Sequence, residues 1–181
     1  ELKLDNQVRF KLCDYRQVKG NFQKIVSVGA FEHFGKKFYK TFFRKIHNIM
    51  TNDGICLLHT IGSVDSPGAV QPFFQRRIFP GGIIPSLSDL VSPIEKTGLI
   101  LADCETLIHH YDKTLKAWLE RFQKNKDKAK YLYNKEFVRM WEFYLSSCSA
   151  AFKFRDLVVY QLQLVKSFTA PPSNRRNYIY Q

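Results

Sequence analysis

The feature that most constrains the fold is a strand, a helix and a second strand that follow one another early in the chain. Residues 24–30 form a β-branched run that suits a buried parallel strand. Residues 36–50 repeat apolar side chains at helical spacing, and residues 55–61 form another short apolar run after the turn signal Asn52-Asp53-Gly54. Because parallel strands need a crossover helix, this pattern predicts a βαβ unit in an α/β fold.

The remaining elements follow from the same kind of pattern, and the length of 181 residues suits one domain over 1–181. In chain order we expect a strand at 8–12, an irregular Pro- and Gly-rich segment at 62–85, a helix from Ser86 to about Thr97, a strand at 99–109, a helix capped by Asp112, a helical segment over 111–155, a final strand at 156–165 and a mobile tail at 170–181.

Composition narrows the class of partner. Lys and Arg number 28 against 16 Asp and Glu, so the net charge of +12 favours an anionic partner. The basic stretches at 36–45 and 121–139 are candidates for anionic lipid head groups, and a simply solvated face is the alternative for each. Four scattered cysteines predict reduced thiols in the cytosol and no metal site. Without an apolar run of about 18 to 20 residues, any membrane contact is expected to be peripheral.

Polar residues that follow the predicted strands are the first candidates for a site. Ligands of open parallel sheets bind outside the carboxyl ends of the strands, where Asp14, Glu32, His33 and His59 fall. The alternative is that the carboxylates cap helices and that His59 is a core histidine. The nine glycines never form a Gly-x-Gly pair, so a complete dinucleotide fingerprint is absent.

Several longer motifs carry a specific resemblance that covers nearly the whole chain. They are Asp14-Tyr15-Arg16; Ile-Val-Ser-Val-Gly-Ala-Phe-Glu-His-Phe-Gly at 25–35; Leu-Leu-His-Thr-Ile-Gly at 57–62; Ile-Phe-Pro-Gly-Gly at 78–82; His-Tyr-Asp-Lys-Thr-Leu at 110–115; and Tyr-Leu-Ser-Ser-Cys-Ser-Ala-Ala-Phe-Lys-Phe-Arg-Asp at 144–156. With these motifs the chain resembles the cyclopropane-fatty-acyl-phospholipid synthases. The mycolic-acid methyltransferases are close relatives.

The resemblance implies a fold and an activity. The fold is a class I methyltransferase-like (Rossmann-like), mostly parallel sheet with flanking helices and a helical insertion, incomplete at its N-terminal side. The activity is transfer of the methyl group of S-adenosylmethionine to the cis double bond of an unsaturated phospholipid acyl chain. A bound bicarbonate ion then removes a proton from the carbocation and the cyclopropane ring closes. The resemblance also implies a cytoplasmic enzyme at the inner face of an anionic membrane.

The resemblance also assigns roles to single residues. Glu32, His59 and Tyr144 match the side chains that hold bicarbonate, and Val28 matches a backbone contact at the same place. Asp14 matches the acidic group near the adenine, and His33 borders the cofactor pocket. Without the resemblance, Tyr144 also suits a core aromatic on a helical stripe.

The match begins near the third strand of the family's sheet, so the glycine-rich cofactor loop has no counterpart here. We therefore expect the chain alone to bind S-adenosylmethionine weakly or not at all and to be inactive; a micromolar affinity in a calorimetric titration would refute this. An uncovered sheet edge favours self-association, including a homodimer.

Three alternatives to the synthase stay open. They are a truncated or degenerate synthase that only binds lipid, a related lipid or mycolate methyltransferase, and a nucleic-acid-binding module. The last is disfavoured, so no nucleic-acid partner is expected: most aromatic residues fall on inward apolar stripes and not among exposed Lys and Arg.

Overall fold

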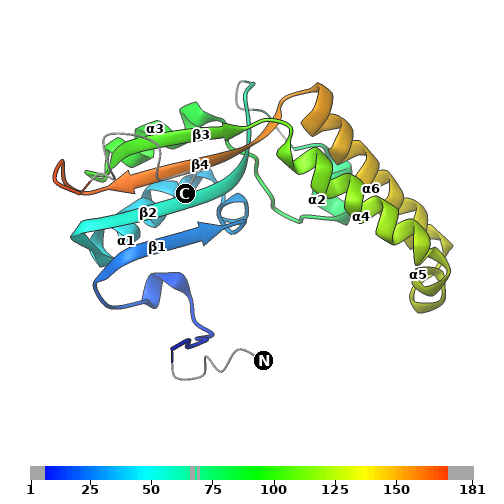
Figure 1. Ribbon diagram of the computed structural model, residues 1–181, viewed down its shortest axis with the longest axis horizontal. Helices are drawn as coiled ribbons and strands as arrows, with labels where there is room; N and C mark the ends of the chain where they lie inside the picture. Colours follow the sequence, from blue (N-terminus) through cyan, green and yellow to red (C-terminus); the bar gives the residue numbers. More distant parts are fainter. Residues whose placement is uncertain (1–6, 66–67, 69, 171–181) are drawn as a thin grey trace.

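The protein is seen in a computed structural model that describes residues 7–65, 68 and 70–170. The predicted βαβ unit is present as β1 (Phe22–Val28), α1 (Tyr39–Ile49) and β2 (Met50–Ser63), with β1 and β2 parallel. The sheet has the order β1-β2-β4-β3, in which β3 (Ile100–Leu107) and β2 both pair antiparallel with β4 (Leu157–Val165) (Figure 1). Three of its four strands therefore run in one direction, and the final strand runs against them.

Helices cover one face of this sheet. α1 and α3 (Leu87–Glu95) pack against it, and the predicted start of α3 at Ser86 is confirmed: the Asp89 carboxylate accepts a hydrogen bond from the Ser86 backbone N–H at 3.1 Å. Short 3₁₀ turns join the main elements, at η1 (Tyr15–Gln17), η2 (Phe31–His33) and η3 (Lys36–Phe38).

The segment between β2 and α3 packs on the rest of the molecule through aromatic side chains. In the described part of the expected irregular segment at 62–85 there is a short helix, α2 (Pro72–Arg77), and the centroid of its Phe73 ring lies 4.8 Å from that of Phe143.

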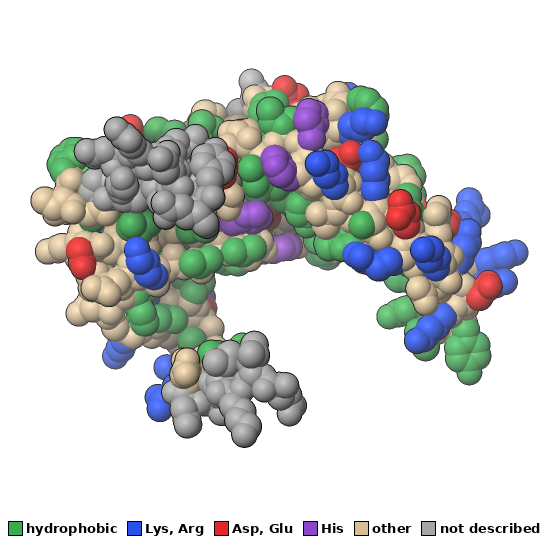
Figure 2. All heavy atoms as spheres, in the orientation of Figure 1, with side chains coloured by type: hydrophobic (Ala, Val, Ile, Leu, Met, Phe, Trp, Pro, Cys, Tyr) green, Lys and Arg blue, Asp and Glu red, His purple; other side chains and the backbone are tan. Residues whose placement is uncertain are grey.

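A second part of the molecule is a helical arm that projects from the end of the sheet (Figure 1). It consists of α4 (His110–Lys124), α5 (Lys126–Leu132) and α6 (Lys135–Phe154), and it corresponds to the helical segment expected at 111–155. Lys and Arg side chains gather at its free end, with hydrophobic side chains among them (Figure 2). None of the helices in the described part of the chain has the length and hydropathy needed to cross a bilayer.

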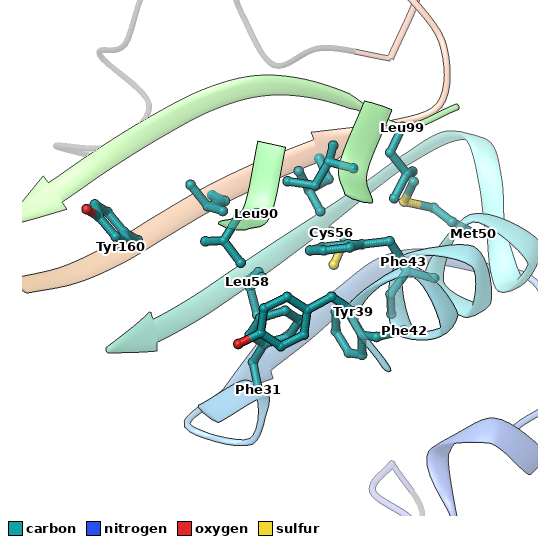
Figure 3. Close-up of a cluster of buried hydrophobic side chains, with 14 of the residues drawn as sticks. Phe31, Tyr39, Phe42, Phe43, Met50, Cys56, Leu58, Leu90, Leu99 and Tyr160 are labelled. Carbon is teal, nitrogen blue, oxygen red and sulfur yellow. The ribbon is translucent and has the colours of Figure 1, made fainter. Parts of the chain in front are cut away.

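The molecule has two hydrophobic clusters, one for each part. The larger lies between the sheet and the helices α1 and α3, and it includes the fully buried Phe31, Phe43 and Leu58 (Figure 3). The smaller lies where the arm meets the sheet, around Leu115 and Tyr144. The arm is thus packed against the sheet by a core of its own.

Three sequence predictions are wrong in detail. Residues 8–12 form no strand, and the side chains of Phe10 and Leu12 are exposed, because alternation makes a strand only where a neighbouring strand can pair with it. Asn52-Asp53-Gly54 lies inside β2 at a register shift and not in a turn; a Cβ on Gly54 would lie 3.1 Å from the Phe22 carbonyl oxygen.

Asp112 does not cap a helix, since α4 begins at His110. Its buried carboxylate accepts hydrogen bonds from Lys116 at 2.7 Å and from the Ser149 hydroxyl at 2.5 Å, so it joins α4 to α6. The expected tail at 170–181 lies, beyond Ala170, outside the described residues.

Candidate functional site

A cavity of about 440 Å³ lies where the helical arm meets the carboxyl ends of β1 and β2. Its wall comes from places that are distant in sequence: the turn after β1, the segment at 70–84, the facing sides of α4 and α6, and the strands β2 and β4 through Ile61 and Leu157. Most of the lining is apolar, as in Ile61, Phe74 and Leu115. Such a space suits a hydrocarbon ligand with a few polar groups to orient it.

Glu32 is the carboxylate of this cavity. It lies in η2 and is 9% exposed. Because β1 ends at Val28, the amide of Ile61 has no partner in that strand, and it donates to Glu32 Oε1 at 2.6 Å. The second oxygen, Oε2, is buried, and no group in the described part of the chain donates to it. Since a buried acceptor without a donor is costly, Oε2 is the atom here that favours a ligand with a hydrogen-bond donor.

Two tyrosines from the arm face the same cavity. Tyr144 of α6 is buried, and its ring meets Phe74 and Phe79 edge to face. Burial raises the pKa of Tyr144 to about 12 and raises the pKa of Tyr111 in α4 as well. Both hydroxyls therefore stay protonated near neutral pH and can donate a hydrogen bond to an anion.

The thiol of Cys148 lines the cavity beside Tyr144. Burial raises the pKa of this thiol to about 11, which keeps it protonated and a poor nucleophile. The cavity therefore offers a carboxylate acceptor and phenol donors, and no activated thiol.

His33, Val28 and His59 lie in or next to the end of β1, in the turn after it, at its last residue and on the paired strand β2. His33 is exposed, lines the cavity and packs near the Phe79 ring. Val28 and His59 are paired in the register of β1 and β2, and neither lines the cavity. His59 is two residues before Ile61 on the same strand face, and its Nδ1 lies 3.5 Å from Gln161 Oε1.

Asp14 stands apart from the cavity. It is the N-cap of η1, as the capping alternative expects, and it accepts from the Arg16 backbone N–H at 2.9 Å. Its carboxylate also forms an ion pair with the Arg16 guanidinium, with 2.5 Å between Asp14 Oδ2 and Arg16 Nη2. The Tyr15 ring stacks on Phe34 at 4.9 Å, which holds this segment against the turn after β1.

The pairing with Arg16 predicts an unusual titration of Asp14. The side-chain hydrogen bond from Arg16 lowers the pKa of Asp14 from 3.8 to about 2. The stabilising effect of the ionised carboxylate is therefore present above about pH 4 and is lost as the pH falls through about 2. We expect the Asp14 carboxyl carbon to titrate near 2 by NMR and to return toward 3.8 in Arg16→Gln. A normal midpoint in the unchanged chain would contradict the pairing.

Comparison with known proteins then places the chain in a family. Residues 1–162 match the sequence profile of mycolic acid cyclopropane synthetases, which is most of the chain. The chain belongs to the mycolic acid cyclopropane synthetase family. This family membership confirms the predicted resemblance, because the cyclopropane-fatty-acyl-phospholipid synthase of Escherichia coli K12 is 38% identical over 155 residues, or 86% of this chain.

Solved structures of the cyclopropane synthetase family confirm the predicted fold class. The cyclopropane synthase MmaA2 of Mycobacterium tuberculosis matches 85% of this chain with a TM-score of 0.79 at 32% identity. The mycolic acid cyclopropane synthase CmaA1, solved with S-adenosylhomocysteine and the detergent CTAB, matches with a TM-score of 0.77 at 31% identity. The chain spans 40% of the length of the Escherichia coli protein and 59% of the MmaA2 chain.

The structure adds cavity residues that sequence reasoning did not single out. Tyr111, Ser147 and Arg155 line the cavity together with Cys148. All four lie in the stretches 110–115 and 144–156, which are among those that carry the resemblance described above. Those motifs were therefore the signal, and only the folded arm shows which of their side chains face the cavity.

Proposed function

We propose that the protein carrying this chain transfers the methyl group of S-adenosylmethionine to the cis double bond of an unsaturated phospholipid acyl chain and closes a cyclopropane ring. The observation that carries this proposal is the Oε2 atom of Glu32, which is buried in a largely apolar cavity and accepts no hydrogen bond from the described residues. Identity to the Escherichia coli cyclopropane-fatty-acyl-phospholipid synthase exceeds identity to the mycolate enzymes above, which favours a phospholipid substrate.

Glu32 and Tyr144 fit a bound bicarbonate ion, which would accept the proton lost on ring closure. Glu32 Oε2 would accept from the hydroxyl of the ion, and the Tyr144 hydroxyl would donate to one of its charged oxygens. In our proposal His59 completes this set from β2 and Val28 contributes its backbone. The apolar walls exclude water, which would make the bound ion a stronger base.

S-adenosylmethionine would supply the methyl group from the carboxyl end of β1. His33 at the cavity rim and Asp14 on the neighbouring segment are the proposed contacts. Because the Asp14 carboxylate already accepts four hydrogen bonds from Arg16, a cofactor hydroxyl or amino group would have to replace one of them. Asp14→Asn should therefore weaken cofactor binding without changing the product.

The proposal places this enzyme at a membrane. A phospholipid acyl chain must leave the bilayer to reach the cavity, and the net charge of +12 favours an anionic, inner-leaflet surface. Peripheral association and a homodimer through the uncovered sheet edge are part of the same proposal. If methyl transfer fails, the result would favour a protein that binds lipid in this cavity without catalysis.

The test is incorporation of a labelled methyl group from S-adenosylmethionine into vesicles of unsaturated phospholipid. We would compare this chain with a protein extended upstream through a glycine-rich cofactor loop. Label should appear in a cyclopropane fatty acid, identified by mass spectrometry, at least in the extended protein. Failure of both proteins would overturn the synthase proposal.

Bicarbonate is tested separately in the protein that shows methyl transfer. In degassed, bicarbonate-depleted buffer the rate of ring closure should fall at least tenfold and return when bicarbonate is added. An unchanged rate would remove the ion from the proposal and leave the methyl transfer intact.

A further inference from the structure

We infer that the free end of the helical arm docks on an anionic lipid bilayer, with exposed tyrosines in the interface and a cationic pocket around lipid phosphates. We call residues 121–139 the arm tip. The inference rests on the proposed function only in the choice of a phospholipid bilayer as partner. It adds the part of the molecule that makes the contact.

The arm tip concentrates positive charge on an exposed surface. It holds seven Lys and Arg residues against Asp127 and Glu136, and all seven basic residues are exposed. Figure 2 shows this cluster of basic side chains at the end of the arm away from the sheet. Charged side chains at one end of an elongated molecule can all approach a flat anionic surface together, and each contributes about fivefold to binding there.

Part of this charge surrounds a pocket of a size suited to a lipid head group. The pocket, of about 350 Å³, lies between α5 and α6. Its lining is Lys126, Asp127, Lys130, Lys135, Val138 and Arg139, so four cations face one carboxylate. Lys126 is partly neutralised by Glu142, 2.8 Å away, which leaves Lys130, Lys135 and Arg139 to meet a phosphate.

Large apolar side chains stand beside these cations at the same end of the arm. Tyr131, Leu132 and Tyr133 are 89%, 62% and 65% exposed. Tyrosine with an apolar ring and a polar hydroxyl is favoured at membrane interfaces, and basic residues beside it complete the usual composition of an interfacial surface. Exposing three such side chains in succession is costly in water unless a partner covers them.

An aromatic row connects the arm tip to the cavity. The Tyr133 ring stacks on Phe137 with 4.2 Å between the ring centroids, and Phe137 stacks on Trp141 with 5.7 Å between them. Trp141 in turn meets Tyr144 edge to face, with the ring centroids 5.0 Å apart. Within α6, the helix rises about 10 Å from Phe137 to Tyr144. These ring contacts connect the surface proposed to touch the bilayer with Tyr144 in the wall of the cavity.

The first experiment compares two sets of charge removals of equal size. Lys130→Gln, Lys135→Gln and Arg139→Gln together alter the arm tip, and Lys37→Gln, Lys40→Gln and Arg44→Gln alter the other basic stretch, near α1. Binding is measured by co-sedimentation with vesicles of phosphatidylglycerol and phosphatidylcholine, without S-adenosylmethionine. We expect the tip variant to lose about 100-fold in affinity and the control to lose less than threefold. Equal losses in both variants would overturn the inference.

The second experiment tests insertion of the tyrosines. The Tyr131→Trp variant adds a tryptophan at the arm tip, and its fluorescence is the difference between the variant and the unchanged chain. This fluorescence should shift to the blue when the variant binds vesicles, and brominated acyl chains should quench it. Tyr131→Ala with Tyr133→Ala should weaken binding about tenfold, and Phe154→Ala, which alters an exposed aromatic near the sheet, should not. Emission of Trp at position 131 that stays at its aqueous wavelength would overturn insertion.

The remaining outcomes separate this inference from the proposed function. Vesicle binding that depends on the arm tip, in a protein without methyl transfer, would refute the proposed function and leave docking standing. Methyl transfer to detergent-dispersed phospholipid with no vesicle binding through the arm tip would refute docking and support the proposed function. Binding of single-stranded DNA by the tip, with no binding of anionic vesicles, would overturn the inference in favour of a nucleic-acid surface.

Discussion

Glu32→Gln is expected to lower the rate of cyclopropane formation about 1000-fold in the methyl-transferring protein. Glutamine keeps the size of the side chain, and its carbonyl oxygen can still accept from the Ile61 amide. The change replaces Oε2 by an NH₂ group, so the buried acceptor at that position is lost. Labelled methyl transfer to unsaturated phospholipid measures the effect.

Product analysis separates a role in holding the base from a role in folding. If Glu32 positions the proton acceptor, the residual product of Glu32→Gln should contain methylated chains without a closed ring. Glu95→Gln, which removes an exposed carboxylate at the end of α3, should retain full activity. If the Glu32→Gln variant forms the same product at a rate within threefold of the unchanged protein, Glu32 does not position the proton acceptor.

Phe43→Ala is expected to lower the free energy of unfolding by about 4 kcal/mol. Phe43 is fully buried in the larger hydrophobic cluster, where its ring packs on Phe31 and Phe42 at 5.5 and 5.3 Å. Truncation removes these contacts and leaves a cavity between the sheet and α1. Urea denaturation followed by circular dichroism measures the change.

Phe154→Ala is the matched control for this stability prediction. Phe154 has the same side chain but is 74% exposed at the end of α6. Its truncation should change the free energy of unfolding by less than about 0.5 kcal/mol. If Phe43→Ala lowers the free energy of unfolding no more than Phe154→Ala does, the stability of the sheet core does not depend on Phe43.

Local patterns were enough to predict the framework of the fold. The βαβ unit, the start of α3 at Ser86 and the final strand are all present, because alternation, helical spacing and capping residues act over a few neighbouring residues. Residues 8–12 show where such patterns stop: they alternate like a strand but have no strand to pair with. The helix α5 lies within the helical segment expected at 111–155, but it was not predicted as a separate helix because its Lys-rich sequence lacks an apolar period.

The candidate site was less accessible from sequence, because its parts come together only in three dimensions. Resemblance singled out Glu32 and Tyr144, and the structure places both on one cavity. The bond from the Ile61 amide to Glu32 depends on where β1 ends, and no sequence pattern reports that. The position of His59 outside the cavity lining likewise follows from strand register.

The construction of the cavity separates stability from selectivity. One wall belongs to the end of the sheet, whose strands are anchored by the larger cluster, and the other belongs to the arm, which has its own cluster. Substitutions on the arm side, at positions such as Ser147 or Ala151, can change the length and width of the cavity while the sheet core stays intact. A lineage with this architecture can therefore reshape the cavity by altering a few helix positions, without first gaining stability elsewhere.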